Sequence, residues 1–213
     1  MNKHNSRGAK ENRINKYLKD WIKKSLVSKI LDIITLLLII LILIPSSRMY
    51  LKTQFTRLTM RPPSVTSGSG NNVLLQPADY RLSLIDNKGK KVTLENFKGQ
   101  VIFLNFWATW CPPCVAEMPD LQDLYDQYKN KVEFFFISNE ESSVTKQFML
   151  KHNLNLPVYH LSGNRVPEAF HSNTIPATFV ISQDGQIIIS RKGAARWNSE
   201  SVKNMLDALL TNQ

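Results

Sequence analysis

The sequence has little cysteine: its 213 residues include two, Cys111 and Cys114, together with four histidines. A tetrahedral zinc site usually takes four cysteine or histidine ligands from two paired clusters. No second pair exists, and the histidines are scattered along the chain (His4, His152, His160 and His171). A structural disulfide around two residues stabilises a fold only weakly. Two inert core thiols remain as an alternative, but CxxC in an α/β pattern favours a redox pair.

Net charge is absent from the larger part of the chain. Residues 62–213 carry 14 Lys and Arg against 14 Asp and Glu, whereas residues 1–61 carry 13 against 3. A nucleic-acid-binding domain needs a basic face on its folded part, which a neutral domain does not supply. We therefore expect no nucleic-acid partner.

Charged residues are also missing from residues 33–47, and Ile33–Ile44 is apolar except for Thr35. Such a run is typical of a membrane-spanning helix. A cleaved signal peptide is the main alternative, but no A-x-A-like cleavage site follows the apolar run. At about 1.5 Å per residue the uncharged run is shorter than a hydrocarbon core of roughly 30 Å, so flanking residues must extend the span. We predict a transmembrane signal anchor over residues 30–47.

The orientation of this anchor follows from its flanks, with nine Lys and Arg before it and four after it. The more basic flank normally stays in the cytoplasm. Residues 1–29 are therefore predicted to be a basic cytoplasmic segment. Because residues 61–72 are rich in turn formers, we predict a flexible linker over residues 48–74. The rest of the chain, residues 75–213, is long enough for one domain with its own core.

Apolar patterning in this domain alternates between strands and helices. Strands are predicted over residues 80–84, 91–93, 101–107, 132–138, 157–160, 177–181 and 186–191. Helices are predicted after the cysteines, over residues 143–152, and from Asn198 or Ser199 to Leu210. This order predicts an α/β fold with parallel central strands, right-handed crossovers and hairpins at both ends.

The cysteines follow the strand predicted over residues 101–107, at the start of a helix. Sites in open α/β sheets lie beyond the carboxyl ends of strands. Backbone N–H groups and the helix dipole there favour a thiolate, whose pKa in a free cysteine is about 8.5. Cys111 is therefore the predicted nucleophile. Cys114 lies on the inward helical stripe with Met118 and Leu121, and is the predicted resolving cysteine.

Three segments of the sequence resemble the TlpA/ResA-type thioredoxin-like family. They are Phe-Trp-Ala-Thr-Trp-Cys-Pro-Pro-Cys at residues 106–114, Glu-Met-Pro at residues 117–119, and Thr-Ile-Pro-Ala-Thr-Phe at residues 174–179. The resemblance implies a thioredoxin-like fold, with a central mixed sheet flanked by helices and an N-terminal β-hairpin extension. It also implies a membrane-tethered or exported bacterial thiol-disulfide oxidoreductase.

The resemblance further implies roles for residues around the cysteines. Pro176 would follow a cis peptide bond and lie against the cysteines, leaving the backbone of Ile175 open to a client peptide. Glu117 would exchange a proton with Cys114, one helical turn away. The full expected site comprises catalytic Cys111, Cys114 and Glu117, and substrate-binding Trp110, Pro112, Pro113, Ile175 and Pro176. No metal or cofactor is expected.

One departure from the family pattern, and three residues placed outside the site, complete this expectation. Ordinary thioredoxins have a buried aspartate six residues before the first cysteine, where this chain has Asn105. Because an amide cannot shuttle a proton, this difference increases the importance of Glu117. Trp107 is expected in the core. Glu140 and Glu141 are expected to be solvated loop carboxylates outside the site.

The predicted activity is exchange of the Cys111–Cys114 dithiol or disulfide with the cysteine pairs of client proteins, mainly as a reductant. The resemblance implies a transmembrane thiol electron donor. The expected location is the inner membrane, as a single-pass protein whose catalytic domain faces the periplasm. A peroxiredoxin-like peroxidase is one alternative. That family has Thr-x-x-Cys at its reactive sulfur, whereas Thr109 here is only two positions before Cys111. The other is a thioredoxin-fold copper metallochaperone, in which His160 or His171 would approach the sulfurs.

Overall fold

The structure, a computed structural model, describes residues 25–43, 45–64, 73–163 and 166–211. The chain divides into two units, residues 1–49 and residues 50–213, and each is described by itself. The predicted basic segment, residues 1–29, lies almost entirely outside the described residues. The cysteines and the predicted thioredoxin-like domain belong to the second unit.

Two helices precede the domain in the sequence, α2 (Leu26–Leu43) and α3 (Pro45–Thr59). Within the described ranges, no helix combines the length and the apolar character needed to cross a membrane. The transmembrane anchor over residues 30–47 stays a prediction. The linker predicted over residues 48–74 is wrong in its first part, which is helical in α3. Residues 48–59 contain no glycine or proline, unlike residues 61–70, so nothing interrupts a helix there.

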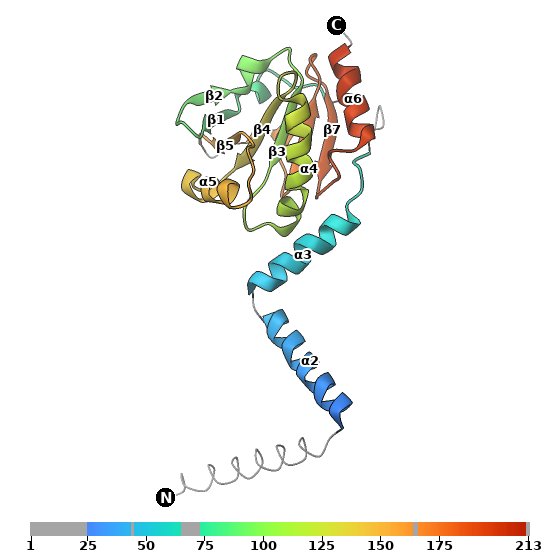
Figure 1. Cartoon of the computed structure of the whole chain (residues 1–213). Helices are drawn as coiled ribbons and strands as arrows, with labels where there is room; N and C mark the ends of the chain where they lie inside the picture. The colour runs from blue at the N-terminus through green and yellow to red at the C-terminus, as the bar shows by residue number, and fades with distance from the viewer. Residues whose placement is uncertain (1–24, 44, 65–72, 164–165, 212–213) are drawn as a thin grey trace, which may run out of the picture. The chain divides into compact units, whose positions relative to one another are not determined.

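Seven strands form one mixed sheet in the order β2-β1-β5-β4-β3-β6-β7 (Figure 1). Their bounds are β1 Ser83–Asp86, β2 Lys91–Thr93, β3 Ile102–Phe106, β4 Glu133–Ser138, β5 Val158–Leu161, β6 Ala177–Ile181 and β7 Ile187–Lys192. Strands β3, β4 and β5 are parallel, and the hairpins β1–β2 and β6–β7 flank them. The predicted mixed sheet and N-terminal hairpin are confirmed.

Alternating side chains of the central strands divide the core into two clusters. In β4, Phe134 and Phe136 join one cluster, whereas Phe135 and Ile137 join the other. This separation follows from the two-residue period of a strand, which sends successive side chains to opposite faces. Both faces of the central strands are buried, which explains why their sequences are continuous apolar runs.

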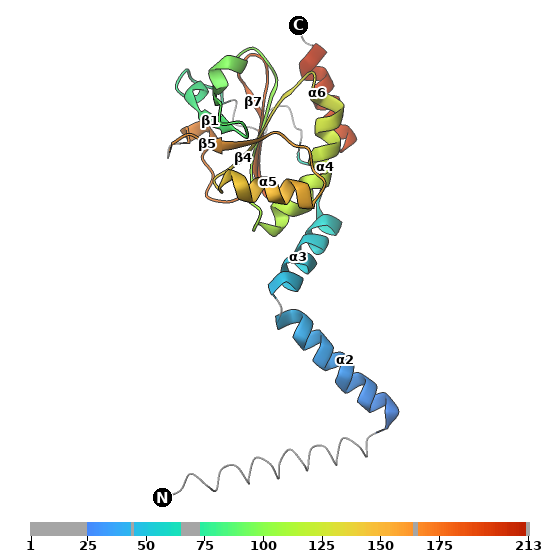
Figure 2. The same ribbon diagram turned by 60° about the vertical axis from the view of Figure 1, so that its left-hand side comes forward.

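The three helices of the domain pack on the same face of the sheet. They are α4 (Pro112–Tyr128), α5 (Ser142–Lys151) and α6 (Glu200–Thr211), and all contribute to the cluster with Phe134. Figure 2 shows α4 and α6 side by side on this face. The opposite face is covered by the 3-10 turns Asp79–Arg81, Leu94–Phe97 and Glu168–Phe170.

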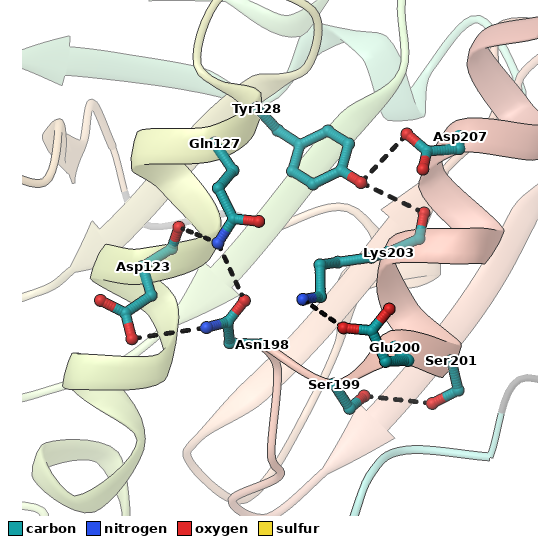
Figure 3. Close-up of polar contacts among 9 residues, drawn as sticks. All are labelled: Asp123, Gln127, Tyr128, Asn198, Ser199, Glu200, Ser201, Lys203 and Asp207. Atoms are coloured by element: carbon teal, nitrogen blue, oxygen red, sulfur yellow. Dashed lines mark hydrogen bonds and ion pairs between the residues drawn. The ribbon is translucent and has the colours of Figure 1, made fainter.

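Polar contacts join α4 to α6 at the outer edge of this face (Figure 3). The Tyr128 hydroxyl donates to Asp207 Oδ1 at 3.0 Å and contacts the carbonyl of Lys203 at 3.3 Å. Burial, followed by the bond to Asp207, raises the pKa of Tyr128 to about 12. Gln127 and Asn198 are also hydrogen bonded, at 3.1 Å. These contacts fix the far end of the helix that begins at the cysteines.

Most predicted elements match the structure within a few residues. The strand predicted over residues 80–84 is the clearest error, because Asp79–Arg81 forms a 3-10 turn and β1 begins at Ser83. The Asp79 carboxylate accepts a hydrogen bond from the backbone N–H of Gln76 at 2.8 Å. An aspartate that bonds to the nearby backbone stabilises a turn in place of a strand.

Candidate active site

The two cysteines lie at the start of α4, just beyond the carboxyl end of β3. Cys111 is the N-cap residue of α4, and Pro112 and Pro113 occupy its first helical positions. Proline is favoured there because the first N–H groups of a helix have no partner within it. The two sulfur atoms form a disulfide, as the predicted redox pair requires.

The two sulfurs differ in their access to solvent. Cys111 is 4% exposed, whereas Cys114 is completely buried. The backbone N–H of Cys114 lies 3.2 Å from Cys111 Sγ and points toward it. This N–H and the positive end of α4 are placed where they would favour a thiolate on Cys111 once the disulfide is reduced. The geometry therefore gives the nucleophile's position to Cys111 and the shielded position to Cys114.

A cis peptide bond joins Ile175 to Pro176, as the resemblance implied. The carbonyl oxygen of Ile175 lies 3.7 Å from Cys111 Sγ, so this loop lies directly against the disulfide. Pro176 accepts a hydrogen bond from the backbone N–H of Gly193 at 2.8 Å, which ties the loop to the end of β7. The expected juxtaposition of this proline and the cysteines is confirmed.

Glu117 is fully buried one helical turn after Cys114, among three donors from two other parts of the chain. Its Oε1 accepts a hydrogen bond from Asn105 Nδ2 at 2.9 Å. Its Oε2 accepts from Trp197 Nε1 at 2.9 Å and from the backbone N–H of Ala195 at 3.1 Å. The carboxyl group thus connects the active-site helix to β3 and to the loop before α6.

Burial raises the pKa of Glu117 to about 7, against an ordinary value of 4.5. Hydrogen bonds from Trp197, Asn105 and Ala195 oppose this shift because they stabilise the charged form. A carboxyl group with this pKa can hold or release a proton near neutral pH. Glu117 therefore has the properties expected of a proton acceptor for a neighbouring thiol.

Asn105 lies on β3, opposite Thr178 of β6. Its Nδ2 donates to both Glu117 and Thr178, the latter at 2.8 Å. Within the described part of the chain, its Oδ1 is buried without a hydrogen-bond partner. Asn105 thus places a neutral amide donor where thioredoxins have an aspartate, and the buried titratable carboxyl is supplied from α4.

Glu140 contacts the loop that leads to the cysteines, although it was expected to be solvated. Its carboxylate accepts from the backbone N–H of Thr109 at 2.6 Å and from the Thr109 hydroxyl at 2.7 Å. Glu141 is exposed, as expected. Glu140 lies two residues after the end of β4, the parallel neighbour of β3. Carboxyl ends of parallel strands share one edge, and this was the signal that could have identified Glu140.

A cavity of about 490 Å³ lies beside the cysteine loop. Its walls include Trp110, Ile175, Phe106, Phe170, His171 and Asn173. Trp110 is exposed and Trp107 is buried, so the predicted core position of Trp107 is confirmed. The residues between His160 and Thr174 that complete this cavity carry no motif, so the cavity was not predicted.

The copper-carrier alternative requires a histidine close to both sulfurs. Across the described ranges, no three or more His, Cys, Asp and Glu side chains form a group able to hold a metal ion. His171 Nε2 lies 3.0 Å from Asn173 Oδ1, and His160 Nε2 lies 3.4 Å from Thr145 Oγ1. The structure therefore offers no ligand set that favours this alternative.

Known proteins resemble this chain in both sequence and fold. The AhpC/TSA family matches residues 76–190, more than half of the chain. Thiol-disulfide oxidoreductase ResA of Bacillus thuringiensis subsp. konkukian is 37% identical over 127 residues, which are 59% of this chain and 70% of that protein. The ResA protein of Bacillus subtilis is 35% identical over 107 residues, covering 49% of this chain and 60% of its own.

Solved structures agree with this sequence similarity. A crystal structure from Bacteroides vulgatus has a TM-score of 0.55 at 27% identity, covering 67% of this chain and 100% of that chain. A thiol:disulfide interchange protein of the thioredoxin family from Chlorobium tepidum has a TM-score of 0.50 at 27% identity, covering 58% and 92%. This chain therefore belongs to the AhpC/TSA family, in which it is a ResA/TlpA-like thiol-disulfide oxidoreductase of the thioredoxin-like superfamily.

Proposed function

We propose that this oxidoreductase reduces disulfides of client proteins, with Cys111 as the nucleophile and Cys114 as the resolving cysteine. The observation that carries this assignment is the asymmetry of the pair. Cys111 Sγ lies at the N-cap of α4 and 3.7 Å from the backbone of Ile175, whereas Cys114 is buried beneath it. A client disulfide can therefore approach only the first sulfur.

The reaction moves two electrons from the dithiol to the client. The Cys111 thiolate attacks one client sulfur, a mixed disulfide forms, and the other client sulfur leaves as a thiolate. Cys114 then loses its proton and attacks Cys111 Sγ, which releases the second client thiolate and forms the Cys111–Cys114 disulfide. Glu117 accepts the proton of Cys114, because its pKa of about 7 lets it take up a proton at neutral pH.

The client segment binds along the surface around Cys111. The backbone of Ile175, held by cis Pro176, offers main-chain hydrogen bonds to an extended peptide. Trp110, Pro112 and Pro113 form the opposite side of this surface. The neighbouring cavity of about 490 Å³ receives apolar side chains of the client, since Phe106, Phe170 and Ile175 are in its wall.

The catalytic domain works outside the cytoplasm, tethered to the inner membrane by residues 30–47, with the N-terminus in the cytoplasm. The uncharged run at residues 33–47 and the excess of Lys and Arg before it support this arrangement. A reductant in an oxidising compartment needs a source of electrons, and a transmembrane thiol donor supplies them. Membrane extraction at alkaline pH and protease protection of the C-terminal domain test the tether and its orientation.

Trapping of client proteins tests the roles of the two cysteines. Cys114→Ser should accumulate mixed disulfides through Cys111, because no second sulfur remains to release the client. Cys111→Ser should trap nothing, and it is the matched control. Both variants should lose insulin reduction. Retained insulin reduction in either variant, or equal trapping by both, would contradict the assignment.

A further inference from the structure

Residues 50–60, which are the second part of α3 and the residue after it, have two faces of opposite character. Thr53 and Met60 are buried against the catalytic domain. Leu51, Phe55 and Leu58 are exposed, and Phe55 and Leu58 reach 70% and 83%. Residues at positions i, i+4 and i+7 share one helical face, so these three form an apolar stripe on the side away from Thr53 and Met60. We call this set the exposed stripe.

The buried face of α3 contacts the domain next to the cysteines. The Thr53 hydroxyl donates to the carbonyl of Pro112, the residue after Cys111, at 3.4 Å. Two residues beyond the helix, the carbonyl of Arg61 accepts from the backbone N–H of Arg196 at 3.0 Å. The exposed stripe therefore lies about one helix diameter, roughly 10 Å, from the start of the active-site helix.

The charged residues of α3 itself, and of the segment just after it, are all basic. The sequence has no Asp or Glu between Asp32 and Asp79, whereas Lys52, Arg57 and Arg61 lie on α3 or just after it. Tyr50, an aromatic residue of the type found at membrane interfaces, is also exposed. A helix with exposed leucine and phenylalanine and only basic charges matches an anionic lipid surface, which attracts basic residues.

The rest of the catalytic unit shows no comparable surface. From residue 73 onward, the large exposed apolar side chains among the described residues are Val73, Leu74, Trp110, Val144 and Leu150. Apart from the adjacent pair at residues 73 and 74, they are dispersed along the sequence. Single exposed apolar residues are common on soluble domains, whereas a continuous stripe marks a contact surface.

We propose that α3 lies in the interface of an anionic lipid membrane, with the exposed stripe in the lipid, and holds the cysteine pair at the membrane surface. A client can then react best when its cysteine pair lies within about one helix diameter of the lipid surface. This inference depends on the contacts of α3, and it stands whether or not Cys111 and Cys114 have the roles proposed above.

Spin labelling of the full chain tests this placement. Cys111→Ser and Cys114→Ser remove the native thiols, and Leu58→Cys introduces one labelling site. The matched control is Leu150→Cys, because Leu150 is also an exposed helical leucine, at 74%. Each labelled chain is placed in nanodiscs of phosphatidylcholine mixed with phosphatidylglycerol, and collision rates with oxygen and with a water-soluble nickel chelate are measured.

We expect the label at position 58 to collide severalfold less with nickel and more with oxygen than the label at position 150. Lys52→Glu should reduce this difference, because it places a negative charge beside anionic lipid. Equal nickel access at both positions would overturn the proposal. Spin–spin coupling between labels at position 58 would also overturn it, because a second copy of the chain would then cover the exposed stripe.

Discussion

Trp197 donates its indole N–H to Glu117 Oε2 at 2.9 Å, and both side chains are completely buried. The same oxygen accepts the backbone N–H of Ala195, so the loop before α6 is tied to the active-site helix through one carboxyl group. A hydrogen bond to a charged group contributes about 1.5 to 3 kcal/mol. Glu117 is thus a structural link as well as the proposed proton acceptor.

Glu117→Gln should change how stability depends on pH. Because burial raises the pKa of Glu117 to about 7 from 4.5, the folded protein keeps a proton in this window that the unfolded chain has lost. The free energy of unfolding therefore falls as pH rises from 4.5 to about 7, by up to roughly 3 kcal/mol. Glutamine has no proton to lose, so the variant should lack this decrease.

Urea denaturation at about pH 5 and about pH 8 measures the effect. The change in the free energy of unfolding between the two pH values is compared for the wild type and the variant. Glutamine fits the site if Asn105 turns its amide, because the unpaired Asn105 Oδ1 would then accept from the new amide. A wild-type decrease that persists unchanged in the variant would assign the titration to another group.

Asn105→Asp should create a pair of carboxyl groups that cannot both ionise. The new oxygen would replace the Nδ2 atom that now donates to Glu117 at 2.9 Å. Two carboxyl groups at this distance share one proton, and the second proton is lost only at much higher pH. The variant should therefore be more strongly destabilised at about pH 8 than at about pH 5, by several kcal/mol.

Asn105→Ala is the control for this variant, since it removes the same amide without adding charge. Its loss of stability should differ less between the two pH values. An Asn105→Asp protein as stable as the wild type at about pH 8 would show that water or a rearrangement separates the two carboxyl groups.

Glu140→Gln should loosen the loop before Cys111. Glutamine accepts from the Thr109 N–H only as a neutral group, and the Thr109 hydroxyl must turn to accept from the new amide, so both bonds lose their charge assistance and stability should fall by about 1 to 3 kcal/mol. Displacement of the loop should also reduce kcat/KM for insulin reduction by about tenfold. Glu141→Gln changes the exposed neighbour and should leave both quantities as in the wild type. Equal effects of Glu140→Gln and Glu141→Gln would contradict the proposal that Glu140 positions the loop before Cys111.

Tyr128→Phe should weaken the contact between α4 and α6. The variant loses the hydrogen bond to Asp207 at 3.0 Å, and we expect a loss of about 1 kcal/mol in the free energy of unfolding. Tyr125→Phe is the matched control, because the Tyr125 hydroxyl has no hydrogen bond within the described part of the chain. Urea denaturation compares the two, and equal stability of both variants would contradict a role for the Tyr128 hydroxyl.

Patterns local to the chain predicted much of the fold. Continuous apolar runs identified β3 and β4, because a strand buried on both faces has no polar alternation. The CxxC spacing identified the redox pair, and the helical period of Met118 and Leu121 predicted that Cys114 is shielded. These inferences succeeded because each depends on neighbours within one helix or strand.

Properties that depend on distant residues were harder to predict. The position of Glu117 beside Cys114 was visible in the sequence, but its burial depends on Trp197 and Asn105. Glu140 looked like a solvated loop residue because its partner, Thr109, comes from another loop. The helical part of the predicted linker was missed because α3 contacts Pro112, and Arg61 just after α3 contacts Arg196, and neither distant contact can be read from the local sequence.

In the reduced protein Cys111 should be a reachable thiolate while Cys114 is shielded, and the rates at which the two cysteines are alkylated measure this difference. Iodoacetamide is applied at mildly acidic pH, where a free cysteine with a pKa of about 8.5 is almost fully protonated, and mass spectrometry identifies the modified residue. Cys111 should react much faster than N-acetylcysteine, and Cys114 should stay unmodified. Alkylation of Cys111 no faster than N-acetylcysteine, or of Cys114 first, would contradict this expectation.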